Sequence, residues 1–183
     1  MYALQLFVLV AVQSYVRISA EDTPDAGPYK IHVANVGQCA EVGKVFTAEA
    51  IKEYQDGDQN RPCFTGNVNL TTDLNDEYTL KVQVQNMVNS SWKDLMSFVF
   101  KKACSDTIKY EANWFEIMKK VNIHVTECPI PKGFYQFKCV SLEGVQIASH
   151  KTVKYGKYRI VESAWDKDTL LGCVTVEGTA SPN

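Results

Sequence analysis

The sequence predicts an all-β fold, a sandwich or a barrel, with one short helical insertion and three disulfides. Short segments in which apolar and polar residues alternate recur along most of the chain, and several such strands at regular spacing are typical of a sandwich or a barrel. One segment after the middle of the chain carries its apolar residues at helical spacing instead. Six cysteines are spread through a chain that begins with an apolar leader, as in secreted, disulfide-bonded domains.

Length and charge narrow the class of protein. The 183 residues are enough for one domain with a sizeable core. The chain has 19 Lys and Arg against 21 Asp and Glu, so no basic excess is present to neutralise phosphates. We therefore expect no nucleic-acid partner.

Residues 1–20 are expected to be a signal peptide. Residues 2–12 are apolar and uncharged, and the small residue Ala20 precedes an acidic, proline-containing stretch. A transmembrane helix needs about 20 predominantly apolar residues, so the leader is too short to span a bilayer. We expect a secreted, extracellular protein in which residues 21–28 form a loose N-terminal lead and residues 29–183 form one domain.

Strands are expected where the period of two is clear. Residues 29–33 alternate first, and residues 80–85 form the clearest strand of the chain. Segment 46–54 fits a strand or a short helix, and its periodicity does not decide between them. The other expected strands are residues 67–71, 92–100, 133–139, 157–161 and 170–176.

The helical insertion is expected after the middle of the chain. Apolar residues of the segment 104–121 recur at roughly helical spacing, namely Ile108, Phe115, Met118 and Val121. Ser105 and Asp106 are the expected N-cap.

The cysteines predict disulfides rather than a metal site. The chain has no Cys-x-x-Cys pair and its three histidines are scattered, so we expect neither a zinc site nor a cofactor. An even set of dispersed cysteines in an oxidising compartment predicts three disulfides, although spacing alone does not choose the partners. Two sequons, beginning at Asn69 and Asn89, are the candidate glycosylation sites.

No familiar catalytic motif occurs in the sequence. It contains no Gly-x-Ser-x-Gly, no His-Glu-x-x-His and no glycine-rich phosphate loop. His32 and His124 lie in strand-like stretches, where a histidine on an exposed face is the simpler interpretation. We therefore expect a protein that is not an enzyme.

Aromatic and apolar residues flank Cys104 on both sides in the sequence. They either fill an ordinary core or line a hydrophobic cavity and its lip, where methionine and aromatic side chains adapt to an acyl chain. Composition alone favours the first interpretation, because large apolar residues are mostly core residues.

Three motifs resemble the ML lipid-recognition family. The segment Cys128-Pro-Ile-Pro-Lys-Gly-Phe-Tyr135 is similar to the "C-P-x-x-x-G-x-Y" signature of that family. Its ganglioside-activator branch carries "G-x-Y-R-I … L-G-C", which resembles residues 156–160 followed by residues 171–173. The "G-N-V-x-L" strand of the same branch resembles residues 66–70, so that the resemblance extends over residues 29–178.

The resemblance implies an immunoglobulin-like β-sandwich opened into a cup that holds a lipid between its sheets. It also implies the disulfide pairs Cys39–Cys173 and Cys104–Cys128, with Cys63 and Cys139 paired as the remaining two. The first of these bonds closes a loop long enough for a stabilisation near 5 kcal/mol as an upper figure. Together with aromatic content, the resemblance gives these candidate ligand-binding residues: Trp92, Phe98, Phe100, Trp114, Phe115, Met118, Phe134 and Tyr158.

The sequence also departs from the ganglioside activators. They brace the mouth of the cavity with two further cysteines, which residues 106–121 lack. Six cysteines with a helical insertion look more like small secreted insect relatives, the chemosensory CheA/CheB-type proteins. The resemblance thus implies a non-catalytic binder of a lipid or hydrophobic cue in contact chemosensation, with a sensory receptor or a membrane surface as a further partner.

Two other functions remain open at this point. One is an activator that lifts a glycolipid from a membrane for a lysosomal hydrolase, with Trp114 and Phe115 as the side chains that enter the bilayer. The other is a receptor co-subunit that carries no ligand.

Overall fold

The computed structural model describes residues 26–54, 62–110, 119, 127–142 and 152–183. In that part of the chain the protein is an all-β sandwich with one short helix and three disulfides, which confirms the predicted fold class. No helix within the described ranges is long and apolar enough to cross a membrane.

The strands predicted from a period of two are present, and most extend beyond the predicted ranges. Segment 46–54, which periodicity left open, is strand β3. The elements are β1 (Ala26–Gly27), β2 (Tyr29–Gln38), β3 (Phe46–Tyr54), β4 (Pro62–Leu70), β5 (Thr79–Val88), β6 (Ser91–Phe100), α2 (Ala103–Tyr110), β7 (Gly133–Val140), β8 (Val153–Lys154), β9 (Gly156–Asp166) and β10 (Thr169–Pro182).

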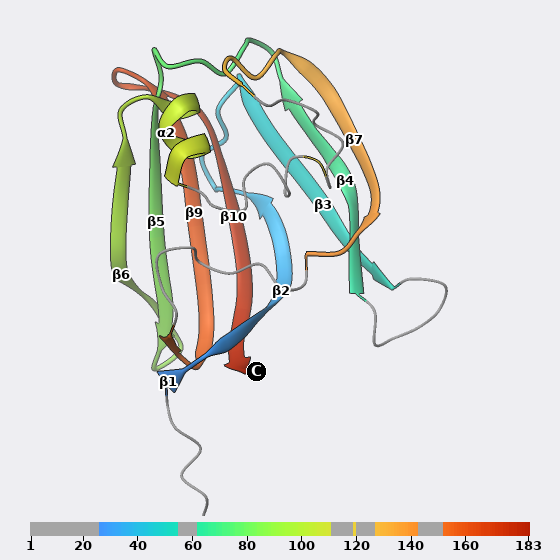
Figure 1. The fold of residues 1–183 in the computed structure, drawn as a ribbon, viewed down its shortest axis with the longest axis vertical. Helices are drawn as coiled ribbons and strands as arrows, with labels where there is room; N and C mark the ends of the chain where they lie inside the picture. The colour runs from blue at the N-terminus through green and yellow to red at the C-terminus, as the bar shows by residue number, and fades with distance from the viewer. Residues whose placement is uncertain (1–25, 55–61, 111–118, 120–126, 143–151) are drawn as a thin grey trace, which may run out of the picture.

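Eight strands form one continuous sheet in the order β6-β5-β9-β10-β2-β3-β4-β7. Strands β2 and β3 are joined by a single residue pair, Val36 with Ala50, and β10 meets β3 through the parallel pair Gly172 and Phe46. The sheet therefore turns at this junction into two layers, one of β6, β5, β9, β10 and β2 and the other of β3, β4 and β7 (Figure 1).

Gly172 permits the close approach of the two layers. A Cβ atom at this position would overlap the carbonyl oxygen of Phe46. The next backbone contact along the junction is a hydrogen bond of 2.8 Å that the Val45 N–H donates to the Leu171 carbonyl oxygen. Only a residue without a side chain fits where the backbones of β10 and β3 lie this close.

The short strand β1 corrects one prediction. Residues 26 and 27, expected in a loose lead, pair with Lys154 and Val153 of β8. The Tyr155 hydroxyl also donates a hydrogen bond of 3.1 Å to the Pro28 carbonyl oxygen. The end of the lead is therefore fixed to the folded domain.

The disulfides join elements that are distant in sequence. Cys39–Cys173 links the end of β2 to β10, Cys63–Cys139 links β4 to β7, and Cys104–Cys128 links α2 to the segment before β7. These are the pairs that the family resemblance implies. Three disulfides indicate an oxidising compartment, extracellular or secretory.

The predicted N-cap of the helix is wrong. Helix α2 begins at Ala103, so Ser105 and Asp106 lie inside its first turn. The Asp106 carboxylate instead accepts a hydrogen bond of 3.1 Å from the backbone N–H of Lys102, just before the helix. The later part of the expected helix, with Phe115, Met118 and Val121, lies outside the described residues.

Replacing Gly172 with alanine is expected to lower the free energy of unfolding by about 1–3 kcal/mol, because the added Cβ forces β10 and β3 apart. The matched control is Gly37→Ala in β2, where a Cβ would meet only Asn35 Nδ2 at 3.8 Å and Thr175 Oγ1 at 4.0 Å. Urea denaturation of both variants checks this prediction. Equal destabilisation by the two changes would show that the junction tolerates a side chain.

Candidate ligand-binding interior

The register of the strands defines an apolar face on the first layer. Residues in register across antiparallel strands point to the same side of a sheet. Three successive rungs across β6, β5, β9 and β10 make up the face that we call the inner face. The rungs are Phe100, Leu80, Ala164 and Gly172; Phe98, Val82, Glu162 and Val174; and Met96, Val84, Ile160 and Val176.

The second layer turns its own apolar side chains toward helix α2. Val68 of β4 lies between Ala48 of β3 and Tyr135 of β7, and Gly66 lies opposite Phe137. A buried cluster of Leu70, Cys104 and Ile130 joins this layer to α2, and the partly buried side chains packed against it include Phe46, Val68, Tyr135 and Phe137. Apolar surface of the second layer is thus covered by the helix.

The aromatic side chains of the interior are only partly buried. Val82, Val84 and Val174 in the middle of the inner face are buried, whereas Phe98 and Phe100 beside them are not. Met96, Ile160, Tyr135 and Phe137 are partly buried as well. Full burial of such a side chain contributes about 1.5–3 kcal/mol. A molecule that covers the exposed part of these side chains would therefore bind with a favourable free energy from the burial of apolar surface.

Glu162 is the one charged residue on the three rungs of the inner face. It lies in register between Val82 and Val174, both of which are buried. A carboxylate among apolar side chains can accept a hydrogen bond from a hydroxyl or an ammonium group of a ligand. The inner face therefore combines apolar surface with one carboxylate.

Tyr158 lies one rung beyond Ile160, opposite Asn86 of β5 and Gly178 of β10. Its hydroxyl donates a hydrogen bond of 2.7 Å to the Lys154 carbonyl oxygen. Burial raises the pKa of the Tyr158 phenol, and the nearby Tyr29 adds to this effect. The ring is consequently a neutral, oriented part of the interior.

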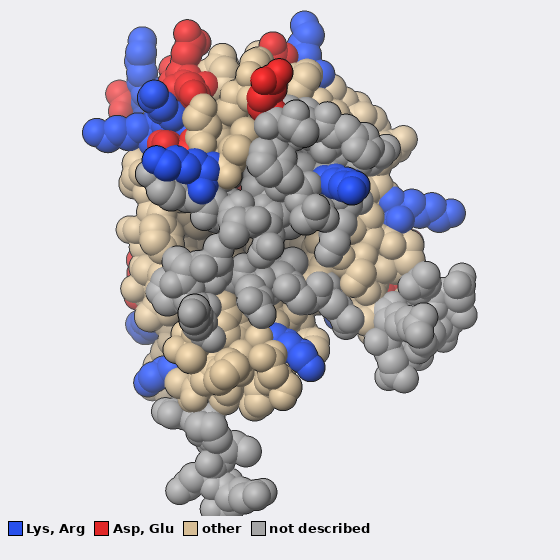
Figure 2. Space-filling model, viewed as in Figure 1, with Lys and Arg blue, Asp and Glu red and all other residues tan. Residues whose placement is uncertain are grey.

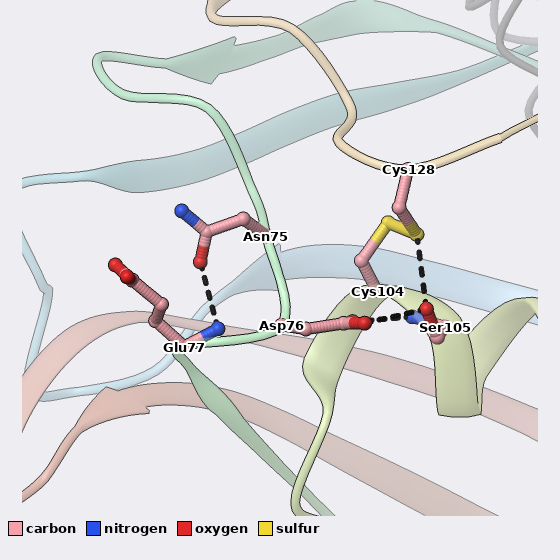
Figure 3. Close-up of a disulfide and its surroundings, with 6 residues drawn as sticks. All are labelled: Asn75, Asp76, Glu77, Cys104, Ser105 and Cys128. Atoms are coloured by element: carbon pink, nitrogen blue, oxygen red, sulfur yellow. Dashed lines mark hydrogen bonds between the residues drawn. A yellow bond between two sulfur atoms is a disulfide. The ribbon is translucent and has the colours of Figure 1, made fainter.

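A polar clamp holds the start of helix α2 (Figure 3). The Asp76 carboxylate accepts hydrogen bonds from the Ser105 backbone N–H at 2.8 Å and from the Ser105 hydroxyl at 2.6 Å. The same hydroxyl lies 3.7 Å from Cys128 Sγ of the disulfide. The turn that presents Asp76 is held by Asn75, whose side-chain oxygen accepts a hydrogen bond of 2.8 Å from the Glu77 N–H.

The clamp favours the charged form of Asp76. Its pKa is lowered from the ordinary value of 3.8, chiefly by the hydrogen bond from the Ser105 hydroxyl and next by the one from the Ser105 N–H. A carboxylate at a helix N-terminus also interacts favourably with the helix dipole. Helix α2, which follows β6 in the chain, is thus fixed at the end of the strands that is uppermost in Figure 1.

A β-bulge separates Trp92 from the other predicted ligand-binding residues of β6. The register shifts between Val84 and Gln85, so that Leu95 is the extra residue. Trp92 pairs with Met87 on the outer face, where the Arg159 guanidinium lies 4.3 Å from its ring centre. Trp92 therefore does not share a site with Phe98 and Phe100, although all three are even-numbered positions of one strand.

Phe134 lies on the outside of the second layer. It is in register with Asn69 of β4 and its side chain is 60% exposed. The aromatic residues of β7 that point inward are Tyr135 and Phe137, which the prediction missed. The signal was present in the sequence, because the polar residues Gln136 and Lys138 alternate in phase with Phe134.

The predicted ligand-binding residues thus fall into three groups. Phe98 and Phe100 lie on the inner face and Tyr158 lies one rung beyond it, whereas Trp92 and Phe134 lie on outer faces. Trp114, Phe115 and Met118 lie outside the described residues.

Described residues line two hollows. One of about 90 Å³ lies where β2 meets the second layer, and its lining includes Val33, Lys52 and Phe64. An open groove of about 360 Å³ crosses β5, β6 and β9 near Trp165, whose ring lies 4.2 Å from the Lys81 ammonium group. The described ranges hold no group of three or more His, Cys, Asp or Glu that could bind a metal ion.

Comparison with known proteins found no match. No protein-family model matches the chain, and no curated protein matches it.

Removing the clamp with Asp76→Ala is expected to lower the free energy of unfolding by about 1 kcal/mol at pH 7, the typical contribution of a helix N-cap. Because the folded state depresses the pKa of Asp76, this contribution is present above the unfolded value near 3.8 and is lost as the pH falls through the folded value. The difference in the free energy of unfolding between the wild type and Asp76→Ala is thus expected to become smaller below pH 4.

Urea denaturation at pH 7 and at pH 3 measures this difference. The matched control is Glu77→Ala, which removes the exposed neighbouring carboxylate and leaves Asp76 in place. If both variants unfold at the same urea concentration at pH 7, the clamp contributes nothing to stability.

Proposed function

We propose that this protein is a secreted, non-catalytic binding protein for a lipid or another long-chain hydrophobic ligand. The observation that carries the proposal is the inner face, where Met96, Phe98 and Phe100 point inward and stay only partly buried. Such a surface gives up water when an alkyl chain covers it. Each buried CH₂ group contributes about 0.8 kcal/mol, so affinity rises with the length of the chain.

The polar groups of the interior support recognition of one end of the ligand. Glu162 is an acceptor on the inner face, and the Tyr158 hydroxyl lies beyond it with its proton donated to the Lys154 carbonyl oxygen.

Contact chemosensation, the perception of pheromone or taste cues, is the role that we propose for this binding. Its support is the resemblance of three motifs to the ganglioside-activator branch of the ML family and of the overall cysteine pattern to its chemosensory relatives. The apolar leader and the disulfides support secretion. A sensory receptor or a membrane surface is the partner that would receive the ligand.

Native mass spectrometry of the non-reduced protein, purified from a secreting eukaryotic host, tests the proposal directly. We expect a mass increment in near-stoichiometric amount, which organic extraction releases as a lipid or a long-chain hydrocarbon. The chemistry of the released molecule separates a cuticle-type cue from a glycolipid. A protein that carries no ligand and takes up no fluorescent fatty probe would contradict the proposal.

Phe98→Ala is expected to weaken binding of a fluorescent fatty probe by about 10-fold, because losing ring contacts worth roughly 1.4 kcal/mol changes a dissociation constant tenfold. The adjacent residue Val99 points to the outer face and is 58% exposed. Val99→Ala is therefore the matched control, expected to change the affinity less than twofold. Equal effects of the two changes in probe titrations would place the ligand elsewhere.

A further inference from the structure

The outer face of the second layer carries an exposed aromatic ring beside a sequon. Thr47 of β3, Asn69 of β4 and Phe134 of β7 form one rung across this face. Phe134, 60% exposed, is the most exposed aromatic side chain among the described residues. The strand that presents it, β7, is the last one in the sheet.

An exposed aromatic ring on a terminal strand invites association with other chains, and natural proteins commonly cover or blunt such edges. No neighbouring side chain covers Phe134 enough to bury it. The residue opposite it, Asn69, opens the sequon Asn69-Leu70-Thr71.

The strand geometry presents this sequon on the outside. Leu70, the last residue of β4, points to the interior and is buried, so Asn69 before it points outward and is partly buried. Thr71, the first residue after the strand, is exposed. Side chains directly opposite each other on antiparallel strands have Cβ atoms about 4.5–5.5 Å apart. A sugar attached to the Asn69 amide nitrogen therefore starts within reach of the Phe134 ring.

We propose that Asn69 carries an N-linked glycan whose first sugars pack on the ring of Phe134. The C–H groups on the face of a pyranose ring and the aromatic face form an apolar contact, while the hydroxyl groups remain in water. The glycan then covers the ring and places a bulky hydrophilic group beside β7. This inference rests on passage through the secretory pathway, which is part of the proposed function.

Asn89 provides an internal comparison. It lies at the tip of the two-residue turn between β5 and β6, where Asn89 and Ser90 have φ angles of 49° and 61° and Val88 pairs with Ser91. No aromatic residue is in register with this tip in the described part of the chain. The ring of the hairpin that is nearest in sequence, Trp92, pairs with Met87 and lies against the Arg159 guanidinium instead.

The experiment is a double-mutant cycle on protein secreted from a eukaryotic host behind a heterologous leader. Thr71→Ala removes the sequon and keeps Asn69, whereas Thr71→Ser keeps both the sequon and the hydroxyl as the matched control. Each protein is made with Phe134 and with Phe134→Ser. Peptide mapping gives the occupancy of Asn69 and Asn89, and calorimetry gives the melting temperatures.

We expect Asn69 to be occupied in the wild type and in Thr71→Ser. Phe134→Ser is expected to lower the melting temperature by about 2–4 °C in these glycosylated proteins and by less than about 1 °C in Thr71→Ala. Loss of the glycan is also expected to increase self-association, and Phe134→Ser to reverse that increase.

An unmodified Asn69 overturns the proposal, and so does a Phe134→Ser shift that is the same with and without the glycan. Uptake of the fatty probe is measured on the same proteins. The inner face belongs to the first layer, whereas the rung of Thr47, Asn69 and Phe134 lies on the outer face of the second layer. A protein that is glycosylated as expected but binds no probe therefore contradicts only the proposed function.

Discussion

The backbone contact between β10 and β3 at Gly172 sets the geometry on which the rest of the sandwich depends. The two layers are joined there by isolated residue pairs instead of a full ladder, so the sheet can turn sharply while its strands stay continuous. Layers that meet along a short junction diverge away from it, as Figure 1 shows. Phe98 and Phe100 lie on β6, the strand of the first layer that is farthest from this junction, and they are only partly buried.

Helix α2 is held firmly at one end of the strands. A covalent bond, Cys104–Cys128, and the hydrogen bonds between Asp76 and Ser105 hold the same helical turn from two directions. Charged side chains of both signs gather on the outside of this end, over α2 and the adjoining turns (Figure 2). The buried cluster of Leu70, Cys104 and Ile130 joins this helix to the second layer, whereas Met96, Phe98 and Phe100 on the inner face are only partly buried.

Alternation of apolar and polar residues predicted most of the strands, because a strand with one apolar and one polar face has a sequence period of two. It failed to decide segment 46–54, where Ile51 is exposed and the pattern is weak. It also could not reveal the bulge at Leu95, since one inserted residue reverses the faces without changing composition, and this bulge places Trp92 on the outer face. In β7 the polar residues Gln136 and Lys138 share the face of Phe134, so alternation predicts that Tyr135 and Phe137 point inward. The sequence could not predict the hydrogen bonds between Asp76 and Ser105, because the fold brings together these two residues from distant parts of the sequence.

The Cys39–Cys173 disulfide affects what happens when a protease cuts the chain. Its two ends lie 134 residues apart and enclose every strand from β3 to β9. A protease that cuts the chain once anywhere between them produces two pieces that the bond still holds together, with the strand ladders on either side of the cut in register. Digestive or environmental proteolysis would then have to make a second cut before any part of the domain could leave. A single covalent bond thereby makes the domain tolerant of a broken backbone.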